Sequence, residues 1–427
     1  MSWVRTFVQE DIPQVATLKW RFLHNGSGPP PPTMESYFRE LFFHGPFSEK
    51  TLPSLVCENE RGRVVGFLGI SRRRMSFHGK PTEAAVGSSL VVDPESRSTM
   101  AGLKLIKCFL SGKQDLAMTD TANQVTQQLW TRLGGSTASL YSIHWSRPLR
   151  PAQYAAYAAS RLRRGPLSRA FVLSSKPICK IVDAIATRIL SSPFLQKPSS
   201  ITEEELTVET LLACMRDFSE PGSLRPEYDR DSVKWLLDFM GQMNAFGSLR
   251  KVLLRNKASK IIGWYLYYLN RGGLGEVVQV GASHSSVKAV LDHLSYDAWT
   301  HGAVALHGRL DSYLLQESLG KSCFYFLGNR LLVHSRDPEL ARHIQAGSAF
   351  LSRLDGEWCL RFGRTDSGLT TQNMGRGLKL STFESVLGEP TRFDPDNISW
   401  DISHNSPLDR RGGLPGGVSR RLNGEPR

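Results

Sequence analysis

Residues 88–103, SSLVVDPESRSTMAGL, join an apolar run to a short polar loop and the start of a second apolar run. This pattern predicts a strand that leads through a loop straight into a helix. The first amides of a helix lack partners within it and attract anions. The side chains that would let a diphosphate approach are Arg97, Ser98, Thr99, Ala101 and Gly102. We therefore predict a pyrophosphate-binding loop here.

A second pattern lies one expected strand later, over residues 123–134, NQVTQQLWTRLG. Its apolar spacing predicts a helix that begins at Asn123 and carries Trp130. The two patterns together resemble the GNAT superfamily of acyl-CoA N-acyltransferases. The family's Arg/Gln-x-x-Gly-x-Gly/Ala loop after Val-x-Pro is similar to residues 92–102, with Met100 at the first glycine. Its Asn-x-x-Ala-x-x-Leu-Tyr-x-x-x-Gly-Phe helix is matched at Asn123, Leu129 and Gly134.

The resemblance covers about residues 1–150 and implies a co-substrate, acetyl-CoA or another acyl-CoA. It also implies direct transfer of the acyl group to an amine. Strand amides of Leu90, Val91 and Val92 would contact the cofactor and polarise the thioester carbonyl. Asn123 and Trp130 would lie beside the pantetheine arm. Trp130 replaces a tyrosine that often serves the family as general acid, and its indole N–H is a poor proton donor.

Three residues are candidates for acid–base catalysis. The family often places a carboxylate base earlier on the strand, which here falls on Gly87 or Ser88, and the nearest acid is Glu83. Tyr141 and His144 are further candidates. Glu83 and Trp130 also have plainer interpretations: a Glu beside a hairpin turn is usually solvated, and a Trp at helical spacing is usually a core residue.

These residues need a scaffold, and the pattern of elements supplies one. The order reads as βααβββ and then alternates strand with helix, which predicts a mixed α/β sheet of GNAT type. A similar order returns after residue 200, so we expect two tandem GNAT-like domains joined by a helical connector. The expected parts are 1–150, an acyl-CoA-binding domain; 151–200, the connector; 201–363, a degenerate second domain; and 364–427, a flexible basic tail.

Composition narrows the class of protein. Of the 427 residues 40% are hydrophobic and 22% charged, so most of the chain can bury a core. Six cysteines stand singly, which predicts neither a metal site nor a disulfide framework. No leader and no bilayer-spanning run is evident, so we expect a cytoplasmic protein. The net charge of +13 favours anionic partners, which include nucleic acid, a membrane surface and coenzyme A phosphates.

Three functions are therefore open. The leading hypothesis is an N-acyltransferase, by default an N-acetyltransferase, that acts on an amine: a small molecule, an amino sugar or a protein lysine. The second is a non-catalytic GNAT-fold protein that binds a ligand or serves as a scaffold. The third is a peripheral protein that binds an anionic membrane surface weakly, or nucleic acid without specific recognition, through the region from Arg161 to Arg164 and the basic tail.

Overall fold

The computed structural model describes residues 2–362, except for 163–176, 187, 190–191, 193, 199, 219–221, 312–313 and 315–322. For residues 97–99, 160–162 and 244 it describes the backbone alone. The described residues fall within one unit, Met1–Lys379. The expected tail, 364–427, lies outside them.

The first sheet has eight strands in the order β1-β2-β3-β4-β5-β15-β6, with the short β9 attached to β3. Among its described strands only β4 and β5 pair in parallel. His78 and Gly79, with φ values of 51° and 73°, make the tight turn between β3 and β4. The strands are β1 (Ser2–Thr6), β2 (Leu55–Asn59), β3 (Val64–Phe77), β4 (Lys80–Val92), β5 (Leu116–Ala122), β6 (Ser136–Ala138), β9 (Arg225–Pro226) and β15 (Arg330–Ser335).

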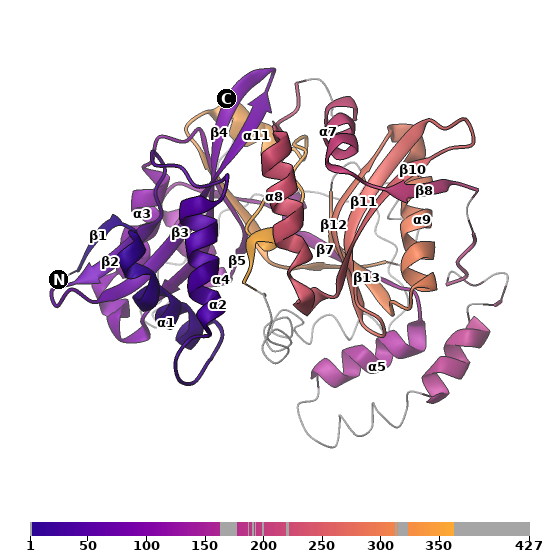
Figure 1. The fold of residues 1–427 in the computed structure, drawn as a ribbon, viewed down its shortest axis with the longest axis horizontal. Coiled ribbons are helices and arrows are strands. Elements are labelled where there is room, and N and C mark those ends of the chain that lie inside the picture. The colour runs from indigo at the N-terminus through magenta and orange to yellow at the C-terminus, as the bar shows by residue number, and fades with distance from the viewer. Residues whose placement is uncertain are drawn as a thin grey trace, which may run out of the picture. The chain divides into compact units, whose positions relative to one another are not determined.

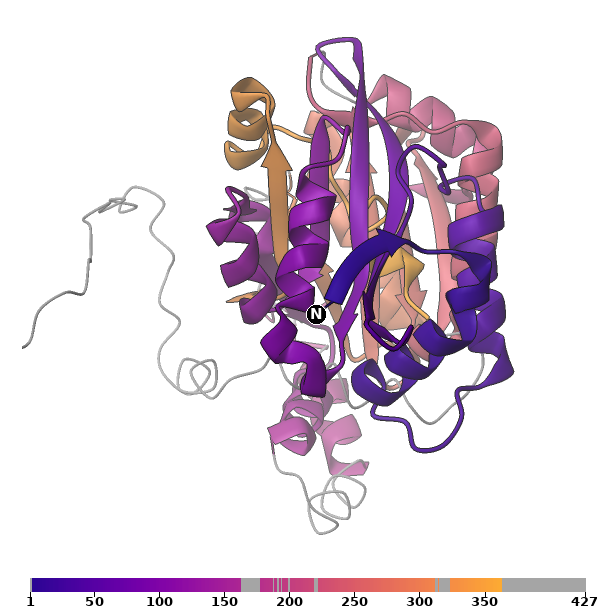
Figure 2. The same ribbon diagram turned by 90° about the vertical axis from the view of Figure 1, so that its left-hand side faces the viewer.

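Helices cover both faces of this sheet. Figure 2 shows the indigo helices α1 and α2 on one side of the strands and the purple helices α3 and α4 on the other. Each helix turns an apolar stripe inward, as its spacing predicts. The helices are α1 (Ile12–Leu23), α2 (Pro32–Arg39), the π-helical turn η2 (Glu40–His44), the 3₁₀ turn η3 (Pro94–Thr99), α3 (Ala101–Leu110), α4 (Gln124–Arg132) and α11 (Pro338–Gln345).

The second sheet has seven strands in the order β14-β7-β13-β12-β11-β10-β8. It too contains a parallel pair, β12 with β13. The strands are β7 (Ile143–Pro148), β8 (Thr202–Glu205), β10 (Ser248–Arg255), β11 (Ile261–Leu269), β12 (Leu274–Ala282), β13 (Ala305–Arg309) and β14 (Phe324–Leu327). Its helices are α5 (Pro151–Leu162), α7 (Val208–Asp217), α8 (Arg230–Gly241) and α9 (Val287–Thr300).

The two sheets have matching strand orders, which fits the expected arrangement of two tandem domains. Read from the other end, the second sheet runs β8-β10-β11-β12-β13-β7-β14, and each element has a counterpart in the first. Each part of the chain contributes one strand to the other part's sheet. Strand β7, from the first part of the chain, pairs with β13, whereas β15, from the later part, pairs with β5. The exchange ties the two sheets together.

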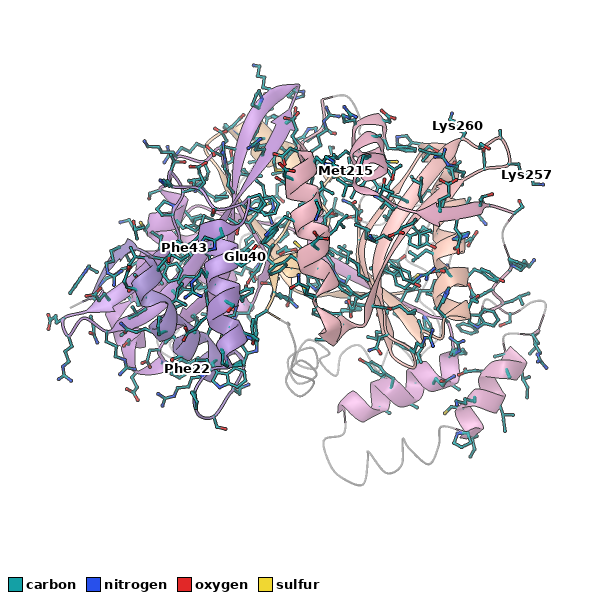
Figure 3. All side chains as sticks on the ribbon, in the orientation of Figure 1. Phe22, Glu40, Phe43, Met215, Lys257 and Lys260 are labelled. Carbon is teal, nitrogen blue, oxygen red and sulfur yellow. The ribbon has the colours of Figure 1, made fainter. Side chains whose placement is uncertain are left out.

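A shared hydrophobic core fills the space between the sheets. One cluster joins side chains of α1 and α2 to those of α7, α8 and the segment 354–360. At its edge Trp235 of α8 donates its indole N–H to Glu40 at 2.6 Å, and Glu40 is labelled in Figure 3. Figure 1 shows α8 between the two sheets and α9 on the far face of the second. None of the described helices has the length and apolar character to span a bilayer.

Candidate functional site

Strand β4 is bulged near its carboxyl end. Phe67 and Gly69 of β3 are two residues apart, yet their partners on β4, Val91 and Ser88, are three apart. The extra residue distorts the backbone, and Ser89 has a left-handed φ of 54°. Bulges of this kind redirect backbone amides and are common next to binding sites. A serine held in this conformation stores local strain of about 1–3 kcal/mol.

Beside the bulge, β4 and β5 separate. They pair only over Ala84–Val86 with Leu116–Met118. Beyond this, between residues 87–92 and 119–122 of the described chain, no pairing continues. The strands therefore open toward their carboxyl ends, which is where ligands bind in parallel regions of α/β sheets.

The chain leaves this opening through the predicted anion loop. Residues 94–99 form the 3₁₀ turn η3, and α3 begins at Ala101. Met100, in place of the family's glycine, has a left-handed φ of 57° and an exposed side chain. The backbone thus keeps the conformation that glycine would favour. A Cβ added to Gly102 would come no closer than 3.5 Å to another atom, so internal packing does not require glycine there.

The predicted contacts at this end of β4 lie as follows. Leu90, Val92 and Ala101 pack on the cluster beneath α3, and Val91 packs on the cluster of the opposite face. The side chains of Arg97, Ser98 and Thr99 lie outside the described structure, so their contact with an anion stays a prediction. The backbone places all three in η3, just before the amino end of α3.

A carboxylate lies in the opening between the two strands. Glu357 Oε1 accepts the backbone N–H of Ser89 at 2.7 Å. Glu357 Oε2 accepts hydroxyl hydrogen bonds from Thr119, at 3.3 Å, and from Thr121. All the residues from 351 to 360 are buried except Glu357, which is partly exposed. Within this segment only Glu357 is thus partly accessible to solvent, and its carboxylate contacts the bulge.

A buried lysine contacts the other side of the bulge. Lys19 Nζ, on α1, donates to Ser89 Oγ at 2.8 Å and to Tyr37 OH at 3.3 Å. Tyr37 in turn donates to the carbonyl of Leu360 at 2.8 Å. Burial lowers the pKa of Lys19 to about 7, although the nearby Glu357 opposes the shift. An amine that titrates near neutral pH thus lies one hydrogen bond from the bulge.

Glu83 is held at the opposite end of the parallel pair. Its side chain forms an ion pair with Arg72 at 2.5 Å, and its backbone N–H donates to Asp115 at 2.8 Å. Six residues of extended chain separate it from Ser89, a span of roughly 20 Å. The structure does not bring Glu83 together with the bulge.

Tyr141 packs on the core of the first sheet, whereas His144 lies on β7 of the second sheet. Tyr141 is buried, and its hydroxyl donates to the carbonyl of Ala349 at 2.6 Å. His144 Nδ1 lies 3.3 Å from Arg353 and 3.4 Å from His307. Burial and the cationic Arg353 hold the pKa of His144 well below its usual value, so this ring is neutral. Both residues belong to the packed junction of the sheets.

The two predicted residues of α4 have structural partners. Asn123 caps the helix, since its side chain accepts the N–H of Thr126 at 2.9 Å. Trp130 is buried beneath the helix and donates its indole N–H to the carbonyl of Val333 at 3.1 Å. These contacts fix α4 against the first sheet. Their roles beside a pantetheine arm remain predictions.

Sequence reasoning missed the residues that surround the bulge. Some of them gave a usable signal, and one did not. Ser89 and Thr119 interrupt apolar strands, which was a usable signal for a polar site. Lys19 lies at an inward position of an amphipathic helix, which was also visible. Glu357 gives no signal, because it enters the site from more than 230 residues away in sequence. Among the described residues no group of three or more His, Cys, Asp or Glu side chains could hold a metal ion.

Known structures share this arrangement of elements. One, described as a conserved protein of unknown function and probable N-acyltransferase from Enterococcus faecalis, is 10% identical with a TM-score of 0.53; the match covers 78% of this chain and 73% of that one. Another, a GCN5-related N-acetyltransferase from Anabaena variabilis, is 13% identical with a TM-score of 0.51, over 79% and 73% of the two chains. No protein-family model matches the sequence, and no curated protein does either. The likeness is one of fold: this chain has the fold of the GCN5-related N-acyltransferases, in a form with two sheets.

Proposed function

We propose that the chain is an acyl-CoA-dependent N-acyltransferase whose reaction takes place at the opening between β4 and β5. The observation that carries the proposal is the amide of Ser89, which the bulge directs at a partly exposed carboxylate. The start of α3 follows the same strand end and offers unpaired amides for phosphates. In this proposal residues 1–150 bind the acyl-CoA, and residues 201–363 contribute the surface for the acceptor.

The residues fit the chemistry of acyl transfer. An amide N–H directed into an opening can stabilise negative charge on a thioester carbonyl oxygen. To use that amide, the carbonyl must replace Glu357 Oε1, while Thr119 and Thr121 still hold Oε2. The displaced carboxylate is then placed to take a proton from the acceptor ammonium.

The transfer then balances in a single displacement. The neutral amine forms a bond to the acyl carbon, and the carbon–sulfur bond breaks to release the thiolate. One proton leaves the ammonium for Glu357 before the attack, and the nitrogen gives up a second proton as the amide forms, which the thiolate takes up to become the free thiol. Lys19 positions the bulge through Ser89 Oγ. Acetyl-CoA is the proposed co-substrate on family resemblance, and the acceptor is an amine.

One observation favours a second function, a non-catalytic binding protein. The same carboxylate engages the bulge amide, and the segment that carries it is buried on both sides. In this second function Glu357 permanently occupies the Ser89 amide and blocks the site as a fixed plug. The two functions make opposite predictions for its removal.

The test measures thiol release from acetyl-CoA with a panel of amines, together with acetyl-CoA affinity. For a catalytic base, Glu357→Gln should lower kcat by about 10²–10³ and leave affinity within a few-fold. The matched control is Glu205→Gln, which removes an exposed carboxylate from a surface ion pair with Lys251. Absence of turnover by the wild type, with acetyl-CoA bound at least about tenfold more tightly by Glu357→Ala, would favour the plug and contradict the transferase.

A further inference from the structure

The segment between the sheets has an unusual charge balance. Across residues 151–200 a single acid, Asp183, stands against eight basic residues. This stretch alone supplies more than half of the chain's net charge of +13. The basic residues are Arg161, Arg163, Arg164, Arg169, Lys176, Lys180, Arg188 and Lys197.

Hydrogen bonds hold two helices of this segment in place, α5 and the helix over residues 177–186. Just before α5, Arg150 donates to the carbonyls of Trp299, at 2.7 Å, and of Ala303. The helix over residues 177–186 is held to α5 by Asp183, whose carboxylate accepts the N–H groups of Ala152 and Gln153 at 2.7 and 3.1 Å. The only acid is therefore buried as a cap and offers no negative charge to the surface.

The opposite side of that helix is apolar and exposed. Its large side chains recur at the i, i+3, i+4 and i+7 spacing of one helix face. Each is 47–66% exposed, in contrast to the buried Asp183. The face is continued past the helix end by one more residue. The exposed residues are Ile178, Ile181, Val182, Ile185 and Ile189. These five residues form the isoleucine face.

We propose that the isoleucine face docks on an anionic lipid surface. An in-plane amphipathic helix inserts its apolar side at the headgroup boundary while basic side chains contact lipid phosphates. Both features are present here: a contiguous aliphatic face and a flanking sequence with eight cations and no exposed acid. Figure 1 shows α5 and the next helix together below the second sheet. The proposal does not depend on acyl transfer.

The experiment is vesicle flotation with the full-length chain. Vesicles of phosphatidylcholine alone are compared with vesicles that contain about one third phosphatidylglycerol. The test variant is Ile181→Glu with Ile185→Glu. The matched control, Val8→Glu with Leu327→Glu, makes the same charge change at two exposed apolar residues elsewhere. Thermal melting confirms that each variant folds, and light scattering records the oligomeric state.

The wild type and the control should bind the anionic vesicles, and the isoleucine-face variant should bind at least about tenfold more weakly. Raising the salt should weaken wild-type binding. The proposal would be overturned if the wild type did not bind anionic vesicles. It would also be overturned if the isoleucine-face variant bound them as well as the wild type. So would a wild-type dimer that the variant converts to a monomer without any vesicle binding, because the face would then contact a second copy of the chain.

Discussion

Each of the two sheets has an opening beyond its parallel pair of strands, and different side chains occupy the two openings. Both parallel pairs, β4 with β5 and β12 with β13, end after three residue pairs. Both also have a bulge on the strand before the opening, at Ser89 in the first sheet and near Val278 in the second. One segment, residues 351–360, reaches both openings.

The difference lies in what that segment places there. In the second sheet Arg353 is buried, its side chain donates to Glu276 at 2.9 Å and to the carbonyl of Val277 at 3.0 Å, and its N–H donates to Val278. In the first sheet the side chain is Glu357, which is partly exposed. One opening is thus held by a buried arginine, and the other by a carboxylate on a partly exposed residue, which is the opening proposed here to admit a ligand.

The largest effect on stability should come from the opening that Arg353 holds. Arg353→Leu leaves Glu276 buried without its partner, which should cost about 3–5 kcal/mol of unfolding free energy. Chemical denaturation measures it. Arg74→Leu, which breaks an exposed ion pair with Asp229, should cost less than about 1 kcal/mol. Equal costs for the two variants would mean that Arg353 does not hold the second opening.

The buried Lys19 beside the first opening should make the free energy of unfolding depend on pH. Burial lowers the pKa of Lys19 to about 7, whereas the unfolded chain keeps this proton up to about 10.5. Between these values the unfolded state binds more protons, so stability should rise with pH, by about 2 kcal/mol from pH 7 to 9. Below pH 7 both states are protonated, and the full cost of burying the charge is present.

Lys19→Met removes this titration. Its unfolding free energy, measured by denaturant titration at several pH values, should vary less than that of the wild type over the same window. Lys104→Met, which removes a lysine bonded to Ser2, is the control and should keep the wild-type slope. Parallel curves for Lys19→Met and the wild type would show that burial does not lower the pKa of Lys19 in solution.

The smallest effect concerns the anion loop. Met100 is exposed and left-handed, so Met100→Gly should be more stable than Met100→Ala by about 1 kcal/mol. Thermal melting of the two variants side by side is sufficient. An alanine variant as stable as the glycine variant would show that the loop does not hold the left-handed conformation in solution.

Sequence reasoning reached the fold because its signals are local. The strand, loop and helix over 88–103 follow from periodicity, and each was found where predicted. The exchange of β7 and β15 could not be predicted, since pairing between strands more than 150 residues apart leaves no local pattern. The same limit hid Glu357. Glu83 was chosen by its position along one strand, which cannot reveal that Arg72 pairs with it.

The central claim is that acyl-CoA enters the first opening and not the second. The direct measurement is calorimetric titration of acetyl-CoA into the wild type, Gly102→Trp and Lys288→Trp, which alter the second residue of α3 and of α9. We predict binding by the wild type and by Lys288→Trp, and at least about 100-fold weaker binding by Gly102→Trp, because the indole would fill the space beside the anion loop. A wild type that does not bind, or binding lost in Lys288→Trp and kept in Gly102→Trp, would contradict the account.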